Sequence, residues 1–167
     1  MKWITRLYVH VDRTAGPWLI KRFIDPKAEF LFVPTEKIEE TAKKEKAIPY
    51  DTPNAELTHH GDQCSFDAII EKYKIKDPAV LELAKIVRAA DTDKIDAAPE
   101  AAGLEAVMTG LGITSKDDYE TIAKASSVYD ALYTNCKLKL IREKYKAEIE
   151  KLDRKDRREF LKKKLVE

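Results

Sequence analysis

The stretch WITRLYVH (residues 3–10) opens the chain with the pattern of a buried strand, and it decides the fold together with the helix and strand predicted after it. Aromatic and β-branched side chains dominate this stretch, as is typical of strands. Asp12 and Thr14 come next as candidate N-caps of a helix with an apolar stripe over residues 18–24. EFLFV (residues 29–33) is a second short strand. The chain therefore begins with a β-α-β unit.

Helices dominate the rest of the prediction. Residues 48–63 are expected to be irregular, with an edge strand near residues 55–59, because prolines and Gly61 interrupt them. Helices are expected over residues 35–46, 65–73, 78–90 and 100–112, and from about Asp117 almost to the end of the chain. Ser65 is the expected N-cap of the second of these helices. The predicted fold class is mostly helical α+β, a small N-terminal sheet packed by about five helices with a long basic C-terminal helix.

The composition and the first residues of the chain limit the possible classes of protein. The 167 residues include 31 basic and 30 acidic side chains, and no run of about 18 apolar residues exists that would span a membrane. The first residues lack the apolar segment of a signal peptide, which favours a cytoplasmic location. Cys64 and Cys136 have no partner pair, which excludes a disulfide framework and a thiolate zinc knuckle.

Charge is distributed unevenly along the chain. Residues 137–167 hold 13 basic and 7 acidic side chains, whereas the acidic side chains outnumber the basic ones in residues 1–136. We therefore divide the chain into a body (residues 1–136) and a basic helical extension (residues 137–167). An apolar seam in the extension requires a partner surface, which predicts a homodimer or a separate regulator bound there. The seam consists of Leu138, Ile141, Tyr145, Ile149 and Leu152.

The segment ELTHHGDQCSFD (residues 56–67) concentrates side chains that bind metals. Imidazole, thiolate and carboxylate are the ligands that borderline divalent metals prefer, and Glu56, His59 and Cys64 supply one of each. No standard zinc signature matches. The alternative is a polar loop in which Asp67 caps a helix and Cys64 is a small buried side chain.

A second group of carboxylates follows the predicted helix that ends near residue 90. Asp91 and Asp93 lie where the helix dipole disfavours negative charge. Asp91 therefore needs compensation from a cation, a metal ion or the start of another helix. The alternative is that one of these carboxylates only caps the next turn.

A third group lies between the first strand and the first helix. Asp12 and Arg13 are found there, and Arg22 follows on the helix. Backbone N–H groups at a helix start and fixed guanidinium charges can hold an oxyanion. The alternative is an N-cap with a salt bridge. No glycine-rich phosphate loop, GxSxG elbow or HExxH motif is present.

Several ordered segments resemble the chromate-resistance protein family, specifically the ChrB C-terminal domain, over about residues 4–136. They are Val11-Asp12-Arg13, Pro17 to Pro26, Glu29 to Pro34, Cys64 to Ala68, Ile86-Val87-Arg88, Ala90 to Asp93, Ala101 to Leu104 and Tyr129 to Tyr133. The resemblance implies a sensor or accessory domain of chromate-resistance systems. Full-length relatives resemble regulators with an N-terminal winged-helix region that binds DNA. That region is not part of this sequence, so direct DNA binding is not expected.

The leading hypothesis is a domain that responds to a metal or an oxyanion. A divalent zinc, iron or manganese ion would be held by His59, by Glu56 or Cys64, and by Asp91 or Asp93. A small anion such as chromate would bind near Arg13, Arg22 and Arg88, with Asp12 and Asp67 as further candidates. The alternatives are a metal-dependent enzyme acting on a small molecule and a non-catalytic dimerisation or partner-binding module.

Overall fold

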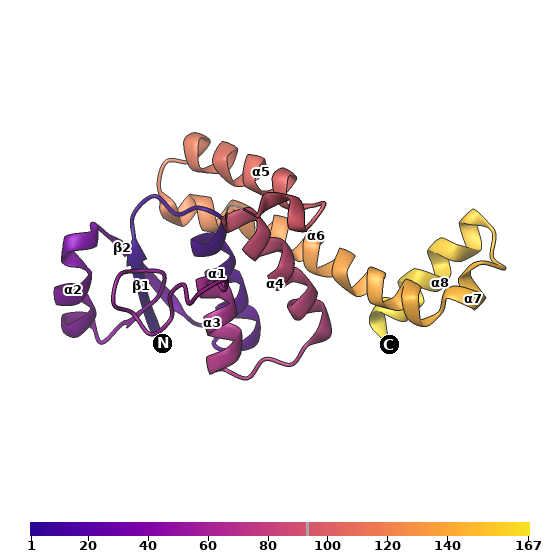
Figure 1. Ribbon diagram of the computed structural model, residues 1–167, viewed down its shortest axis with the longest axis horizontal. Helices are drawn as coiled ribbons and strands as arrows, with labels where there is room; N and C mark the ends of the chain where they lie inside the picture. The colour runs from indigo at the N-terminus through magenta and orange to yellow at the C-terminus, as the bar shows by residue number, and fades with distance from the viewer. Residues whose placement is uncertain (93) are drawn as a thin grey trace.

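The computed structural model describes residues 1–92 and 94–167, and it has the predicted mostly helical α+β architecture (Figure 1). The predicted residue Asp93 lies outside the described residues. The elements are β1 (Lys2–Arg6), α1 (Val11–Phe23), β2 (Glu29–Val33), the 3-10 helix η1 (Thr35–Lys37), α2 (Ile38–Glu45), β3 (Ile48–Pro49), α3 (Ser65–Lys72), α4 (Pro78–Asp91), the 3-10 helix η2 (Ile95–Ala97), α5 (Ala101–Thr114), α6 (Asp118–Lys144), α7 (Lys146–Ile149) and α8 (Arg154–Val166).

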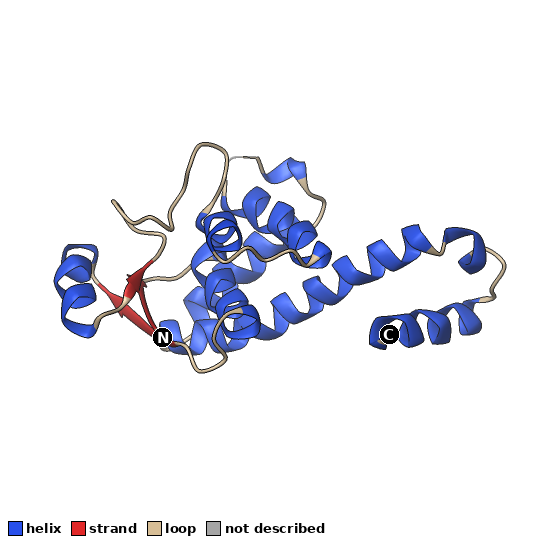
Figure 2. Cartoon of the chain, turned by 90° about the horizontal axis from the view of Figure 1, so that it is seen from below, coloured by secondary structure: helices blue, strands red, loops and turns tan. Residues whose placement is uncertain are grey.

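The sheet is parallel, with strand order β2-β1-β3. Strand β1 lies in the middle and buries Trp3 and Ile4 completely, and Ile4 is in register with Leu31 of β2 and Pro49 of β3. Helix α1 connects β1 to β2, so the predicted β-α-β unit is confirmed. The predicted edge strand near residues 55–59 is wrong, because only a single bridge from Tyr50 to Leu57 forms there. In Figure 2 the sheet lies between α2 and the helical body.

Helix α4 is the central helix of the body, as its apolar composition predicts. Val80, Leu83 and Val87 are fully buried, and the helix packs against α1, α5 and α6. Its start also follows the sequence signals: Pro78 occupies the first turn, and the Asp77 carboxylate accepts hydrogen bonds from two backbone N–H groups. This packing fixes the position of the C-terminal end of α4.

The C-terminal part departs from the prediction. Helix α6 ends at Lys144 instead of continuing almost to the chain end, and the chain turns through α7 so that α8 folds back beside α6 (Figure 2). The rings of Tyr145 and Phe160 pack edge to face across this turn, with centroids 5.6 Å apart. A straight helix would leave the predicted apolar seam in water, whereas the hairpin covers part of it and buries Ile149.

Candidate functional site

Four side chains from three separate segments meet beside the start of α1. The Nε2 atom of His59 lies 3.2 Å from Asp12 Oδ2, 3.2 Å from Asp91 Oδ2 and 3.4 Å from Asp51 Oδ1. The donor atoms of Asp12, His59 and Asp91 all lie within 4.8 Å of one another. We call Asp12, Asp51, His59 and Asp91 the Asp–His cluster.

Asp12 reaches the cluster from the first turn of α1, where the helix dipole favours a carboxylate. It does not cap its own helix, because the N-cap residue is His10. Instead, the backbone N–H of Ser65 donates to Asp12 Oδ2 at 2.9 Å, and the Ser65 hydroxyl donates to Oδ1. The Asp12 side chain is almost completely buried. Ser65, at the start of α3, therefore fixes the orientation of this carboxylate.

Asp91 is the last residue of α4, the position at which the sequence predicts a need for compensation. The structure supplies it from the start of another helix: the backbone N–H of Asp12 donates to Asp91 Oδ1 at 3.2 Å. The other carboxylate oxygen faces His59. Burial, followed by the charge of Asp12, raises the pKa of Asp91 to about 7.

Asp51 joins the cluster through a left-handed backbone conformation, with φ of 44°. This conformation is uncommon for residues other than glycine, although Asp tolerates it better than most. The carboxylate is buried, and its Oδ2 atom accepts from Arg13 at 2.9 Å and from Arg6 at 3.3 Å. Its Oδ1 atom faces His59. Asp51 was not predicted from the sequence, because the path of the loop through space, and not a sequence motif, brings it to the cluster.

His59 is the only member of the Asp–His cluster with substantial exposure, at 41% of its side chain. The hydrogen bond to Asp12, with support from the charges of Asp51 and Asp91, raises the pKa of His59 to about 9. In the absence of a metal ion the imidazole therefore carries a proton at neutral pH. The cluster is closed on its protein side and open to solvent at His59.

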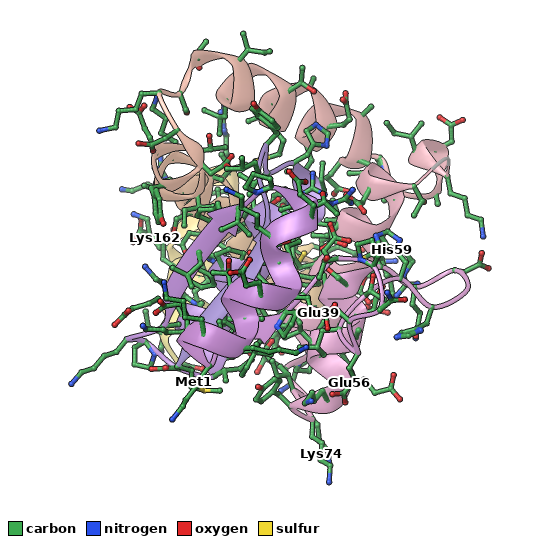
Figure 3. The ribbon with its side chains drawn as sticks, turned by 90° about the vertical axis from the view of Figure 1, so that its left-hand side faces the viewer. Met1, Glu39, Glu56, His59, Lys74 and Lys162 are labelled. Carbon is green, nitrogen blue, oxygen red and sulfur yellow. The ribbon has the colours of Figure 1, made fainter. Side chains whose placement is uncertain are left out.

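The structure does not bring two of the predicted metal ligands to the cluster. Glu56 lies apart from His59 and forms an ion pair with Lys72 at the outer surface (Figure 3). Cys64 is the N-cap residue of α3, in place of the predicted Ser65 cap, and its thiol donates to Asp67 Oδ2 at 3.4 Å. Burial raises the pKa of the Cys64 thiol far above its ordinary value, so it stays protonated.

The three predicted anion-binding arginines each have a carboxylate partner. Arg13 pairs with Asp51, and Arg88 forms a bidentate pair with Asp67 at 2.8 and 2.6 Å. Arg22 pairs with Asp130 at 2.8 Å and stacks near Trp18 on the surface of α1. The three guanidinium groups therefore do not form a single anion site, and among these three arginines only Arg13 contacts the Asp–His cluster.

The fold and the cluster define an α+β protein with a carboxylate–histidine site at the junction of β1 and α1. The family described as the ChrB C-terminal domain matches residues 3–136, and the chain belongs to this family. Protein ChrB of Cupriavidus metallidurans is 33% identical over 135 residues, which cover 80% of this chain. The chain spans about 40% of the length of that relative. No solved structure gives a significant match.

Among residues 1–92 and 94–167, none of the helices combines the length with the apolar character that a membrane-spanning helix needs. All members of the Asp–His cluster lie inside the family match, whereas α7 and α8 lie beyond it. The cluster therefore belongs to the part of the chain that the family shares.

Proposed function

We propose that this chain is a divalent-metal-binding domain of the chromate-resistance type, in which Asp12, His59 and Asp91 hold the metal ion. The observation that supports this most strongly is the convergence of three donor atoms within 4.8 Å from α1, the loop after β3 and the end of α4. Each carboxylate also has a hydrogen-bond partner that orients it, as is common for the ligands of metal sites.

The charge of the cluster supports the same proposal. Asp12 and Asp91 lie close together at low exposure, and no guanidinium or ammonium group within the described residues pairs with either. Their charge is balanced only by His59 and by hydrogen bonds. A divalent cation would neutralise the two carboxylates and favour the unprotonated imidazole.

The ligand atoms limit which metal ions fit the site. Two carboxylates and one imidazole suit manganese, iron or zinc, and the protonated Cys64 thiol leaves the set without the sulfur ligand that softer metals favour. Asp51 lies close enough to His59 to take part, but Arg6 and Arg13 already hold its carboxylate. We therefore assign Asp51 a role in orienting and balancing the site.

An oxyanion would then bind to the metal ion itself. Three protein ligands leave coordination positions open, and the exposed side of His59 gives access from solvent. Chromate is the anion that the family resemblance implies. A metal-dependent enzyme would use the same open positions, and turnover of a small molecule by the metal-bound chain would assign that role instead.

The metal site is tested by isothermal titration of the full chain with MnCl₂ and, separately, ZnCl₂. Asp12→Asn and Asp91→Asn each remove one anionic ligand, and we expect a loss of affinity of about 100-fold or more for each. Glu56→Gln is the matched control, because Glu56 pairs with Lys72 at the surface. Equal affinities in all variants, or equal losses in all three, would contradict the proposal.

Anion binding is tested separately, by chromate titration of the metal-bound and metal-free chain. We expect chromate to bind the metal-bound form only and sulfate to compete with it. Chromate binding of equal strength without metal would contradict a metal-centred anion site while leaving the metal site intact.

A further inference from the structure

The hairpin of α6 and α8 forms a groove that the proposed metal site does not involve. Its volume is about 440 Å³. Its apolar lining comes from Leu138 of α6 and from Leu161 and Leu165 of α8. Its basic lining consists of Arg142 of α6 and of Arg154, Arg157, Arg158 and Lys162 of α8. In Figures 1 and 2 this hairpin projects away from the body, so the groove is reachable from solvent.

The arginines that line this groove have no carboxylate partner within the described residues. The ion pairs formed by α8 involve lysines: Lys162 pairs with Glu159, and Lys164 pairs with Glu167. The four arginines that line the groove are exposed, and residues 137–167 as a whole carry 13 basic against 7 acidic side chains. The groove therefore presents free guanidinium groups in a strongly positive region.

The arrangement along α8 indicates the shape of a ligand. Residues 154, 158, 161 and 165 are spaced by four, three and four, which places them in one line on the helix. At 1.5 Å per residue this line is about 17 Å long. Its first half is cationic and its second half is apolar, and Leu138 and Arg142 of α6 repeat this pairing of leucine with arginine.

These features favour one kind of partner. An amphipathic helix could place apolar side chains on the leucines and carboxylates against the guanidinium groups, which bind carboxylates in a bidentate manner. Duplex DNA would meet the arginines through phosphates but would leave the leucines without a partner. A second copy presenting the same groove would bring like charges together.

We propose that the groove between α6 and α8 binds an acidic amphipathic helix of a partner protein. Leu138, Leu161 and Leu165 accept its apolar side chains, and Arg142, Arg154 and Arg158 pair with its carboxylates. The surface lies outside the family match, so partner binding is a property of this extension.

The test uses the full chain and three fluorescently labelled probes at physiological salt. The first is an 18-residue peptide with leucine at helical spacing i, i+3, i+4, i+7 and glutamate at most other positions. The second has the same charge but glutamine in place of leucine, and the third is a 20-base-pair DNA duplex. We expect the first probe to bind about tenfold or more tightly than either of the others.

Two charge-reversal variants locate the binding site. Arg154→Glu combined with Arg158→Glu should weaken binding of the leucine peptide by about tenfold or more. Lys155→Glu combined with Lys163→Glu makes the same change of charge on α8 outside the groove, and it should weaken binding less than about threefold. Amide hydrogen exchange of residues 154–166 verifies that α8 remains folded in both variants.

Three results would overturn the proposal. They are tighter binding of the duplex than of the leucine peptide, equal binding of the two peptides, and equal losses in the two double variants. The first result would indicate that the groove binds nucleic acid. Either of the other two would indicate that the peptide binds only by non-specific charge attraction.

Discussion

Ser65 fixes the position of a carboxylate that is central to the proposed metal site. Its backbone N–H and its hydroxyl both donate to Asp12, which is 1% exposed. The Asp12 carboxylate is therefore oriented before any metal ion binds. Such preorganisation lowers the cost of assembling the ligands around the ion.

Ser65→Ala removes the hydroxyl donor and leaves the backbone donor in place. We expect the affinity for Mn²⁺ to fall about tenfold, because partners of metal ligands typically contribute 10- to 100-fold. We also expect a loss of about 1–3 kcal/mol of unfolding free energy, because the buried Asp12 oxygen loses a partner. Isothermal titration and urea unfolding measure the two effects.

Ser127→Ala is the control for this prediction, since Ser127 is exposed on α6. Ser127→Ala should change neither the affinity for Mn²⁺ nor the free energy of unfolding. An unchanged Mn²⁺ affinity in Ser65→Ala would contradict this prediction. It would show either that Asp12 binds the metal ion without help from Ser65 or that Asp12 is not a metal ligand.

The pKa values of the cluster predict how metal binding depends on pH. The pKa of His59 is raised to about 9 and that of Asp91 to about 7, so both groups hold protons more tightly than usual in the metal-free protein. A metal ion must displace these protons. The affinity for Mn²⁺ should therefore rise as the pH increases from 6 to 9, with release of protons.

Titrations in two buffers of different ionisation enthalpy measure this proton release directly. We expect about 1.5 protons per metal ion at pH 7 and about one at pH 8, mainly from His59, because Asp91 gives up its share of protons over this range. Binding that is independent of pH over this range would contradict the assignment of His59 as a ligand.

Part of the Asp–His cluster could be predicted from the sequence. His59 emerged from its neighbourhood of ligand types, and Asp91 from its unfavourable place at the end of a helix. Asp51 could not be predicted, because it reaches the site through a left-handed turn that no local pattern encodes. Glu56 and Cys64 were plausible by type, but their positions depend on the path of the loop through space.

Helix α4 contributes directly to the site, because it carries Asp91 at its C-terminal end. The two ends of α4 are determined by different kinds of interaction. The start is determined by the local Asp77–Pro78 signal, whereas the placement of the end depends on packing against α1, α5 and α6. A defect at the start should therefore lower stability without altering the geometry of the site.

Asp77→Ala removes the N-cap of α4 and the acceptor of the Tyr133 hydroxyl. We expect it to lower the free energy of unfolding by about 1–2 kcal/mol, measured by urea unfolding of the metal-free chain. Asp77→Asn keeps a capping oxygen and should cost less than the alanine variant. Equal losses in the two variants would show that capping is not the cause.

The predictability of the elements follows from where their signals lie. The β-α-β unit and α4 have strong local patterns, so the sequence was sufficient for both. The α6–α8 hairpin was not predicted, because an apolar seam such as that from Leu138 to Leu152 indicates that a partner surface is needed but not which one. In the structure α8, which begins only a few residues further along the chain, provides this partner surface.

Helix α6 connects the body to the hairpin without interruption. The family match ends at residue 136, within this helix. We therefore expect the hairpin to behave as an appended module whose stability is separate from that of the Asp–His cluster.

Phe160→Ala tests this separation, because Phe160 packs on Tyr145 across the hairpin. We expect faster amide hydrogen exchange over residues 154–166, and an affinity for Mn²⁺ within about twofold of the unaltered chain. Faster exchange throughout the body, or a large loss of metal affinity, would show that the two parts fold as one unit.

The most direct test of the metal site is electron spin-echo envelope modulation of the full chain with one equivalent of Mn²⁺. We predict modulation from one directly coordinated imidazole nitrogen. This signal should be lost in His59→Ala and retained in His60→Ala, since the His60 ring contacts the Glu56 backbone carbonyl instead. Absence of nitrogen modulation in the unaltered chain, or its persistence in His59→Ala, would contradict the proposed site.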